Sequence, residues 1–324
     1  MIRGGLEGTA WNLSAALVDE SGAIYEKSAT YTPARGGIHP REALQHHAEH
    51  MRAVVGDVLA QARQRGLKLE GVAFSQGPGL GPCLRTVATA ARALSLRFDI
   101  PLVGVNHCVA HIEVGKWQSG ARDPAVIYVS GANSQVLALR QGRYRIFGET
   151  LDISVGNAID KFARSVGLAH PGGPKVEELA RKAKNYIPLP YTVKGMDLSF
   201  SGLSTAATEA AGKHDLEDVC YSLQETAFAM LVEVTERAMA HAEKREAMLV
   251  GGVGANARLG EMMRIMCHER GAEFFLPPRS FMGDNGSMIA YTGLLMLKSG
   301  ISTPLDQSHV RPGYRTDEVL VSWA

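Results

Sequence analysis

The sequence repeats one order of predicted elements, and this repeat limits the fold more than any other feature. Each copy has three strands, a helical segment, a short apolar strand, a glycine-containing loop and a final helix. The first copy comprises, in chain order, residues 4–9, 13–19, 23–31, 40–65, 70–75, 76–82 and 83–97. The second comprises residues 125–130, 135–140 and 144–150, a longer, mainly helical segment at 156–245, and then residues 247–250, 251–256 and 257–269. Such a duplication predicts two α/β lobes that are built alike.

Two facing α/β lobes with a central cleft are the layout of the actin, sugar-kinase and heat-shock-ATPase superfamily. We expect an N-terminal lobe over residues 1–120 and a C-terminal lobe over 121–324, the latter carrying the helical insertion at about 156–245. Glycine loops at the carboxyl ends of strands let backbone N–H groups approach phosphates. A nucleotide or acyl-nucleotide in the cleft is therefore predicted, although each loop taken alone is equally consistent with a tight turn.

Composition excludes several protein classes. The chain has 324 residues, of which 45% are hydrophobic and 21% charged, which is typical of about two folded domains rather than of disorder. No apolar run approaches the roughly 20 residues that cross a bilayer. Charged residues near the start, where a secretory signal would be apolar, predict a cytoplasmic protein.

Cysteine spacing and net charge argue against further classes of protein. The four cysteines form no C-x-x-C pair, so neither a zinc ribbon nor a disulfide framework is predicted. A formal net charge of +1 argues against a chain that binds nucleic acid alone.

A histidine pair indicates a metal site. His107 and His111 are four residues apart, which places both imidazoles on one helical face. A zincin protease would need Glu directly after the first histidine, but that position is Cys108. Asp284 could add an oxygen ligand from the other lobe, so that the ion bridges the cleft. Two alternatives stay open: the histidines form ordinary hydrogen bonds, and Asp284 is the N-cap of the last helix.

Nine segments of the sequence carry a family resemblance. They are residues 76–94, 106–115, 128–133, 148–164, 171–179, 189–206, 222–237, 251–256 and 283–291. Together they resemble the universal tRNA threonylcarbamoyladenosine transferase family. The resemblance is greatest to its archaeal and eukaryotic branch, the catalytic subunit of the KEOPS complex. It spans nearly the whole chain.

The resemblance implies an acyltransferase and its site residues. The family transfers threonylcarbamoyl from threonylcarbamoyl-AMP to the exocyclic amine of the adenosine 3′ of the anticodon, in tRNAs reading codons that begin with A. The implied ligands of one divalent ion, iron or zinc, are His107, His111, Tyr128 and Asp284. The implied substrate-binding residues are Tyr128, Val129, Ser130, Gly131, Ala132, Asp160, Gly173, Glu177 and Asn256.

These residue types suit the implied chemistry. Asp160 or Glu177 could accept hydrogen bonds from ribose hydroxyls, and Gly173 leaves space for an adenine. Glu7, at the end of the first strand, is a candidate proton acceptor, with a structural role as the alternative. Trp11 stands where relatives usually have His, and its large indole could alter how the substrate fits.

The expected partners are tRNA and the other KEOPS subunits, namely a small atypical protein kinase, a dimerising subunit and a tRNA-binding subunit. Helix faces near residues 40–65 and the inserted helices are possible docking surfaces. Candidate phosphate contacts are Arg140, Arg143, Arg145, Lys161, Arg164, Arg181, Lys182 and Lys184. The alternatives to the transferase are an ATP-dependent phosphotransferase of the same superfamily, a non-catalytic nucleotide-binding scaffold and a metallopeptidase.

Overall fold

The computed structural model describes residues 2–33 and 37–323; Met1, residues 34–36 and Ala324 lie outside the described part. The chain divides into two compact units. Unit 1 comprises Met1–Val114 and Gly283–Ala324, and unit 2 comprises Gly115–Met282. Among the described residues, no helix is both long and apolar enough to span a membrane.

Unit 1 is built on a five-stranded sheet. Its strands are β1 (Ile2–Glu7), β2 (Asn12–Val18), β3 (Ala23–Thr30), β4 (Leu69–Gly77) and β5 (Leu102–Asn106). Their order across the sheet is β3-β2-β1-β4-β5. The first three strands form an antiparallel ladder, whereas β4 and β5 run parallel to β1. The carboxyl ends of β1, β4 and β5 therefore share one edge of the sheet.

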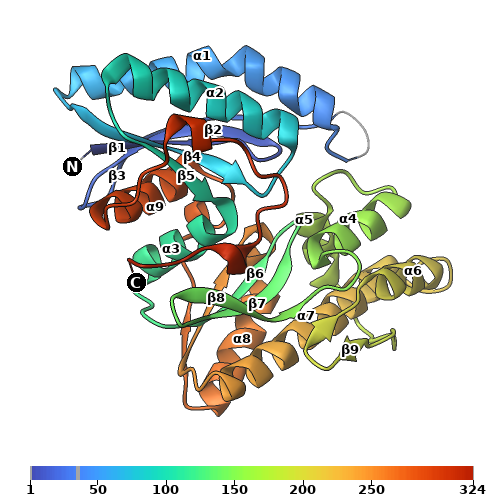
Figure 1. Cartoon of the computed structure of the whole chain (residues 1–324). Helices are drawn as coiled ribbons and strands as arrows, with labels where there is room; N and C mark the ends of the chain where they lie inside the picture. Colours follow the sequence, from blue (N-terminus) through green and yellow to red (C-terminus); the bar gives the residue numbers. More distant parts are fainter. Residues whose placement is uncertain (1, 34–36, 324) are drawn as a thin grey trace. The chain divides into compact units, whose positions relative to one another are not determined.

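Helices cover both faces of this sheet. The helices α1 (Pro40–Gln64) and α2 (Gly81–Phe98) lie on one face, and α9 (Gly286–Lys298) lies on the other (Figure 1). Apolar residues of β1, β2 and β4 form the core beneath α1 and α2. On the α9 side the approach is closer, because a Cβ added to Gly5 would lie only 2.3 Å from the backbone nitrogen of Ala290. A glycine at position 5 thus lets the helix backbone rest on the strand.

Unit 2 repeats the same sheet. Its strands are β6 (Ala125–Val129), β7 (Ser134–Arg140), β8 (Arg143–Glu149), β11 (Glu246–Val250) and β12 (Glu273–Phe275). Their order is β12-β11-β6-β7-β8, with β6, β7 and β8 antiparallel and β11 and β12 parallel to β6. This is the connectivity of unit 1, strand for strand.

The remaining elements of unit 2 are mostly helices packed around one core. They are α4 (Val155–Ser165), α5 (Gly172–Ala180), α6 (Ser201–Ala210), α7 (Leu216–His241) and α8 (Ala257–Glu269), with a small hairpin of β9 (Val193–Lys194) and β10 (Asp197–Leu198). The core joins α7 and α4 to β6, β7 and β11. The helix α7 is buried along most of its length because it lies in the middle of this layer.

The predicted duplication and the mixed α/β fold are confirmed. The predicted segment 257–269 matches α8, and the mainly helical segment predicted at 156–245 corresponds to the stretch from α4 to α7. The unit boundaries differ from the predicted lobes, since residues 283–324 belong to unit 1. The helix α9 buries its apolar face on β1, β2 and β4, which draws the end of the chain back to the first sheet.

Candidate metal and substrate sites

The histidine pair lies at the start of a capped helix. The strand β5 ends at Asn106, and α3 (His107–Ser119) begins at the next residue. The Asn106 side-chain oxygen accepts hydrogen bonds from the backbone N–H groups of Cys108 (3.0 Å) and Val109 (3.1 Å). These bonds fix the first turn of α3. His107 and His111 therefore project from the same helical face, with ring centroids 4.7 Å apart.

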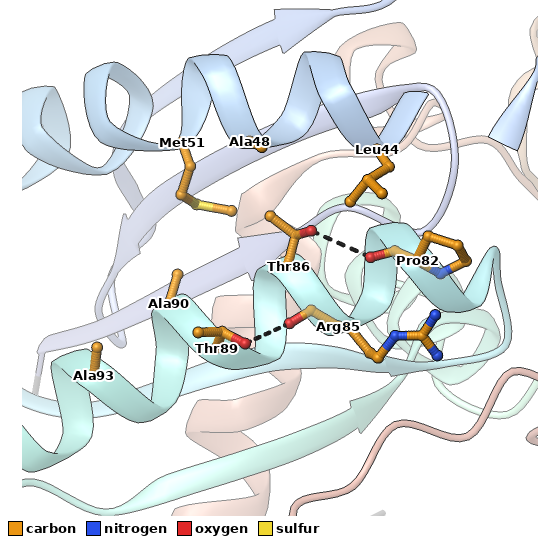
Figure 2. Close-up of a pocket in the computed structure, with 9 residues that line it drawn as sticks. All are labelled: Leu44, Ala48, Met51, Pro82, Arg85, Thr86, Thr89, Ala90 and Ala93. Atoms are coloured by element: carbon orange, nitrogen blue, oxygen red, sulfur yellow. Dashed lines mark hydrogen bonds between the residues drawn. The ribbon is translucent and has the colours of Figure 1, made fainter. Parts of the chain in front are cut away.

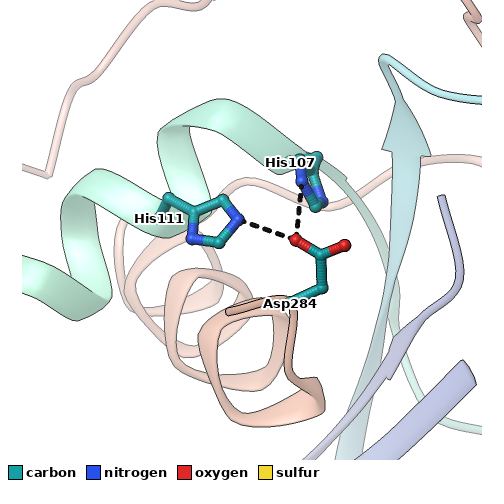
Figure 3. Close-up of side chains that lie close together, drawn as sticks. All are labelled: His107, His111 and Asp284. Carbon is teal, nitrogen blue, oxygen red and sulfur yellow. Dashed lines mark hydrogen bonds and ion pairs between the residues drawn. The ribbon is translucent and has the colours of Figure 1, made fainter. Parts of the chain in front are cut away.

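Asp284 faces these two imidazoles (Figure 3). Its Oδ1 lies 3.1 Å from Nε2 of His111 and 3.5 Å from Nε2 of His107. The proposal that Asp284 caps α9 is wrong, because Asn285 is the N-cap and accepts the N–H of Met288 at 2.8 Å. The expectation that Asp284 comes from the second lobe is also wrong, since all three residues belong to unit 1.

The β1–β2 turn holds Asp284 from another side. The side-chain amide of Asn12 donates to the Asp284 backbone carbonyl at 2.7 Å, and Thr30 in turn donates to the Asn12 amide oxygen. The indole N–H of Trp11 donates to the Asp284 carboxylate. Trp11, which stands where relatives usually have His, thus contacts the candidate ligand Asp284 directly.

The donor set fits a transition-metal ion. The candidate ligand atoms of His107, His111 and Asp284 all lie within 4.8 Å of one another. Two imidazole nitrogens and one carboxylate oxygen are donors that zinc and non-haem iron both accept. The site is thus suited to one divalent ion, which would still take a further ligand.

Glu7 lies directly behind His107. Its carboxylate is fully buried, and its Oε2 is 3.1 Å from Nδ1 of His107. The other oxygen, Oε1, accepts the backbone N–H of Thr9 at 2.8 Å. Both oxygens of Glu7 are therefore bound within unit 1.

The electrostatics of the cluster favour cation binding. Burial alone would lower the pKa of His107, but the carboxylates of Glu7 and Asp284 outweigh it and raise the pKa to about 9. Burial lowers the pKa of His111, which is therefore neutral at neutral pH. Burial by itself would raise the pKa of Asp284, yet His107 and His111 hold it below its ordinary value. A metal ion binding here would replace the Nε2 proton of His107.

Tyr128, the fourth implied ligand, belongs to unit 2. It is the penultimate residue of β6 and is 1% exposed. Its hydroxyl accepts a hydrogen bond of 3.5 Å from the side-chain amide of Asn133. Spacing gave no indication of this residue, and only the family resemblance identified it.

Four of the implied substrate residues lie at the end of β6, with Val129 as the last residue of the strand and Ser130, Gly131 and Ala132 in the turn that follows. Ser130 organises it, since its hydroxyl accepts the backbone N–H groups of Ala132 (3.3 Å) and Asn133 (3.0 Å). The Ser154 hydroxyl, at the start of α4, donates to the carbonyl of Gly131 at 2.6 Å. Val129 is fully buried, so of this residue only the backbone is available to a ligand. The turn thus rests against the N-terminus of α4.

Asp160 and Gly173 lie at the junction of α4 and α5. The Asp160 carboxylate accepts the backbone N–H of Gly172 at 2.7 Å and lies 3.6 Å from Nδ1 of His170. A Cβ at Gly173 would meet no atom within 4 Å. Asp160 therefore holds the loop before α5, and open space adjoins Gly173.

Glu177 and Asn256 meet at the start of α8. Glu177 Oε1 accepts the backbone N–H of Ala257 at 3.2 Å. Asn256 caps α8 and donates from its side-chain amide to Gln224 at 2.9 Å. Gln224 is a buried polar residue of α7 that the sequence analysis did not single out. These four implied substrate residues thus all lie in unit 2. Asp160 is in α4, Gly173 and Glu177 are in α5, and Asn256 is the N-cap of α8.

The preceding glycine loop needs glycine at its first position. Gly251 has a φ of +91°, and a Cβ there would lie 2.3 Å from the carbonyl oxygen of Val129. The loop backbone therefore passes close to the end of β6. This contact brings the glycine loop next to the Ser130 turn within unit 2.

A separate hollow of about 550 Å³ lies between α1 and α2 in unit 1 (Figure 2). Apolar and hydroxyl-bearing side chains line it together with one arginine, the residues being Leu44, Ala48, Met51, Pro82, Arg85, Thr86, Thr89, Ala90 and Ala93. It contains none of the candidate metal or substrate residues. It lies on the helix face near residues 40–65 that the sequence analysis marked as a possible docking surface.

Comparison with known proteins identifies the family to which this chain is similar. The sequence model described as TsaD, tRNA N6-adenosine threonylcarbamoyltransferase, matches residues 22–291. A Methanothrix thermoacetophila protein named tRNA N6-adenosine threonylcarbamoyltransferase is 78% identical over 320 residues, which are 99% of each chain. A Methanosarcina mazei protein, named a probable bifunctional tRNA threonylcarbamoyladenosine biosynthesis protein, is 66% identical over 98% of this chain. The match spans 59% of that relative's length.

Solved structures agree on the fold. HypF of T. kodakarensis aligns with 92% of this chain and 48% of its own, at a TM-score of 0.62 and 15% identity. That likeness concerns the fold alone, whereas the sequence matches extend over nearly the whole chain. The chain therefore belongs to the tRNA N6-adenosine threonylcarbamoyltransferase family.

Proposed function

We propose that this chain transfers a threonylcarbamoyl group to the N6 amine of an adenosine in tRNA. One observation carries the proposal, namely the 78% identity over 99% of both chains to a relative named for that activity. The convergence of His107, His111 and Asp284 supports it, because these residues could hold a metal ion. Such an ion would make the acyl carbon more electrophilic, which helps a weak nucleophile to attack it.

The donor in this proposal is threonylcarbamoyl-AMP, and the acceptor is the adenosine 3′ of the anticodon in tRNAs reading codons that begin with A. The amine nitrogen bonds to the carbamoyl carbon, the bond from that carbon to the AMP phosphate oxygen breaks, and the amine loses one proton. The amine is a poor nucleophile because its lone pair is delocalised into the ring. An anticodon loop presents unstacked bases, so no duplex has to open.

Four residues would hold the metal ion: His107, His111, Asp284 and, from unit 2, Tyr128. The family resemblance favours iron first and zinc second, and this donor set is compatible with both. When bound, such an ion supplies Lewis acidity toward the oxygens of the threonylcarbamoyl group. The protein's part is to fix the donor atoms, which the Asn106 cap and the Asn12 contact to Asp284 do.

Unit 2 would bind the adenylate. The acyl-phosphate end would lie at the turn of Ser130, Gly131 and Ala132, the positions that the family resemblance implies. Asp160 and Glu177 suit ribose hydroxyls as acceptors, and the open space beside Gly173 suits the adenine. Asn256, held by Gln224, would add an amide contact. Whether ATP also binds here is answered by competition between the two nucleotides.

We further propose that the chain works in the cytoplasm with the other KEOPS subunits, a small atypical protein kinase, a dimerising subunit and a tRNA-binding subunit. The bifunctional name of the longer Methanosarcina mazei relative is consistent with a linked second activity. The hollow between α1 and α2 supports the expectation that this helix face contacts a partner protein.

The test combines the chain and its partner subunits with threonylcarbamoyl-AMP and unmodified tRNA, and measures the modified nucleoside by mass spectrometry. We expect His107→Ala and Asp284→Ala to lower the rate on the order of 100-fold or more, as loss of electrostatic stabilisation does. His268→Ala, an exposed histidine on α8, is the matched control and should keep the wild-type rate.

Two results would contradict the proposal in different ways. Equal modified nucleoside from wild type and His107→Ala would remove the metal from the mechanism. No modified nucleoside from the wild-type complex, with ATP consumed in the absence of tRNA, would favour a phosphotransferase instead.

A further inference from the structure

The carboxylate of Glu7 does not have the surroundings of a proton acceptor. It has no exposed surface, and each oxygen already accepts a hydrogen bond within unit 1. A general base must reach the proton that it removes, directly or through one water. The contacts of Glu7 therefore favour a role that is exerted through His107.

The two nitrogens of His107 face opposite neighbours. Nδ1 lies 3.1 Å from Glu7 Oε2 and 3.5 Å from the Thr9 hydroxyl, whereas Nε2 lies 3.5 Å from Asp284 Oδ1. An ionised carboxylate can only accept, so the Nδ1 atom must donate its hydrogen to Glu7. The tautomer that keeps this bond has its lone pair on Nε2, which is the atom that faces Asp284.

The backbone around Glu7 is fixed on several sides. The N–H of Gly8 donates to the Ser75 hydroxyl at 3.2 Å, and the carbonyl of Thr9 accepts the N–H of Leu80 at 2.7 Å. A Cβ at Gly8 would lie 2.4 Å from a methyl group of Val87. Because β1 is the central strand of its sheet, Glu7 is presented to His107 from a strand that is paired on both sides.

We propose that Glu7 is a positioning residue for the metal site, and that it orients His107 by accepting the Nδ1–H so that Nε2 faces the ion. This inference rests on the proposed metal site but is separate from the transfer activity. Hydrogen-bond partners of this kind typically change metal affinity 10–100-fold when removed.

The experiment measures the affinity of the purified full chain for cobalt(II), which replaces zinc or iron and has visible absorption bands sensitive to its ligands. We expect Glu7→Ala to raise the cobalt dissociation constant about 10–100-fold. Glu7→Gln should raise it roughly tenfold or less, because the amide carbonyl still accepts the Nδ1–H. His107→Ala is the positive control. Val72→Ala, a buried change on the adjacent strand β4, is the control for general destabilisation and should bind cobalt as wild type does.

The outcomes separate this inference from the metal site itself. If His107→Ala weakens cobalt binding and Glu7→Ala does not, the positioning role is wrong while the metal site stands. If Glu7→Gln binds cobalt as weakly as Glu7→Ala does, the proposal that the hydrogen bond orients His107 is wrong. If wild type and His107→Ala bind cobalt equally, both the site and this inference are wrong.

Turnover separates positioning from proton transfer. With saturating metal, Glu7→Gln should recover modification close to the wild-type rate. A Glu7→Gln chain that binds metal but stays inactive would overturn the positioning role in favour of proton transfer. Should Glu7→Ala fail to fold, nitrogen-15 NMR of histidine-labelled wild type with zinc gives the same decision. Nδ1 carrying the proton supports the proposal, and Nδ1 bound to zinc overturns it.

Discussion

His47 shows how a single buried side chain ties stability to pH. Its ring is fully buried on the inner face of α1, next to Gly8. Burial, with a smaller contribution from His46, lowers the pKa of His47 to about 4, whereas an unfolded chain has a histidine pKa near 6.5. The unfolded state therefore binds a proton more readily than the folded state between these values, so stability falls as the pH falls through this window.

We predict that His47→Leu flattens this pH dependence. Between pH 7 and pH 4.5 the wild-type free energy of unfolding should fall by about 2–3 kcal/mol more than that of His47→Leu. Urea unfolding at several pH values measures the difference. His214→Leu, an exposed histidine of unit 2, should follow the wild-type curve. A parallel pH dependence in wild type and His47→Leu would contradict the shift.

For single residues, the sequence predicts the candidate metal ligands better than it predicts the side chains that contact them. The spacing of His107 and His111 was sufficient to propose a metal pair, because a helix has a fixed period. The contact between Glu7 and His107 joins residues 100 apart and depends on which strands are adjacent. The side chain of Asp284 could not be assigned from local pattern, since Asp284 and Asn285 are both good N-caps and only packing selects between them.

The start of α9 is the element on which the candidate site most depends, because Asp284 lies just before it. Glu26, on β3, accepts hydrogen bonds from the Ser287 backbone N–H (3.0 Å) and hydroxyl (2.6 Å). A carboxylate at a helix N-terminus is favourable because the free N–H groups carry partial positive charge. The strand therefore holds the first turn of the helix in place.

We predict that Glu26→Ala lowers the free energy of unfolding by about 1–2 kcal/mol, which is the range of a lost helix cap. Chemical denaturation of the full chain measures it. Lys27→Ala, the next residue of β3 and exposed, is the matched control and should change stability little. If Glu26→Ala were as stable as Lys27→Ala, the contact to Ser287 would not be a significant anchor.

Long periodic elements were predicted closely, and short ones were not. The helix α8 matches its predicted bounds because apolar spacing and the Asn256 cap agree. The strand β5 was missed, since five residues between Pro101 and His107 are too few for periodicity to separate strand from helix. The three residues of β12 give still less signal.

At the scale of the whole chain, unit 1 is formed by two segments that are distant in the sequence and pack against each other. Gly5 of β1 lies against Ala290 of α9, and Gly293 of α9 lies against Ala73 of β4. The repeat in the sequence predicted two similar sheets, but not that residues 283–324 would join the first. The close contacts of Gly5 and Gly293 join residues that are far apart in the chain, so local sequence pattern did not indicate them.

We predict opposite effects for two glycine-to-alanine substitutions. Gly5→Ala places a Cβ into the α9 backbone, so it should lower the free energy of unfolding by about 1–3 kcal/mol or more. Gly56→Ala, in the middle of α1 with no atom within 4 Å, should raise it by about 0.5–1 kcal/mol. Thermal and urea unfolding of the two variants compare them directly. A stable Gly5→Ala chain would mean that α9 can move away from β1 at little cost.

The return of residues 283–324 to unit 1 has a consequence for biosynthesis. Domains generally fold in the order in which they leave the ribosome, yet here every residue of unit 2 emerges before unit 1 is complete. Until α9 is translated, the nascent sheet of β1–β5 lacks the helix that covers one of its faces. It then presents apolar surface of the kind that chaperones bind. Asp284 reaches His107 and His111 only at that stage, so the three candidate ligands come together after all of unit 2 has been translated.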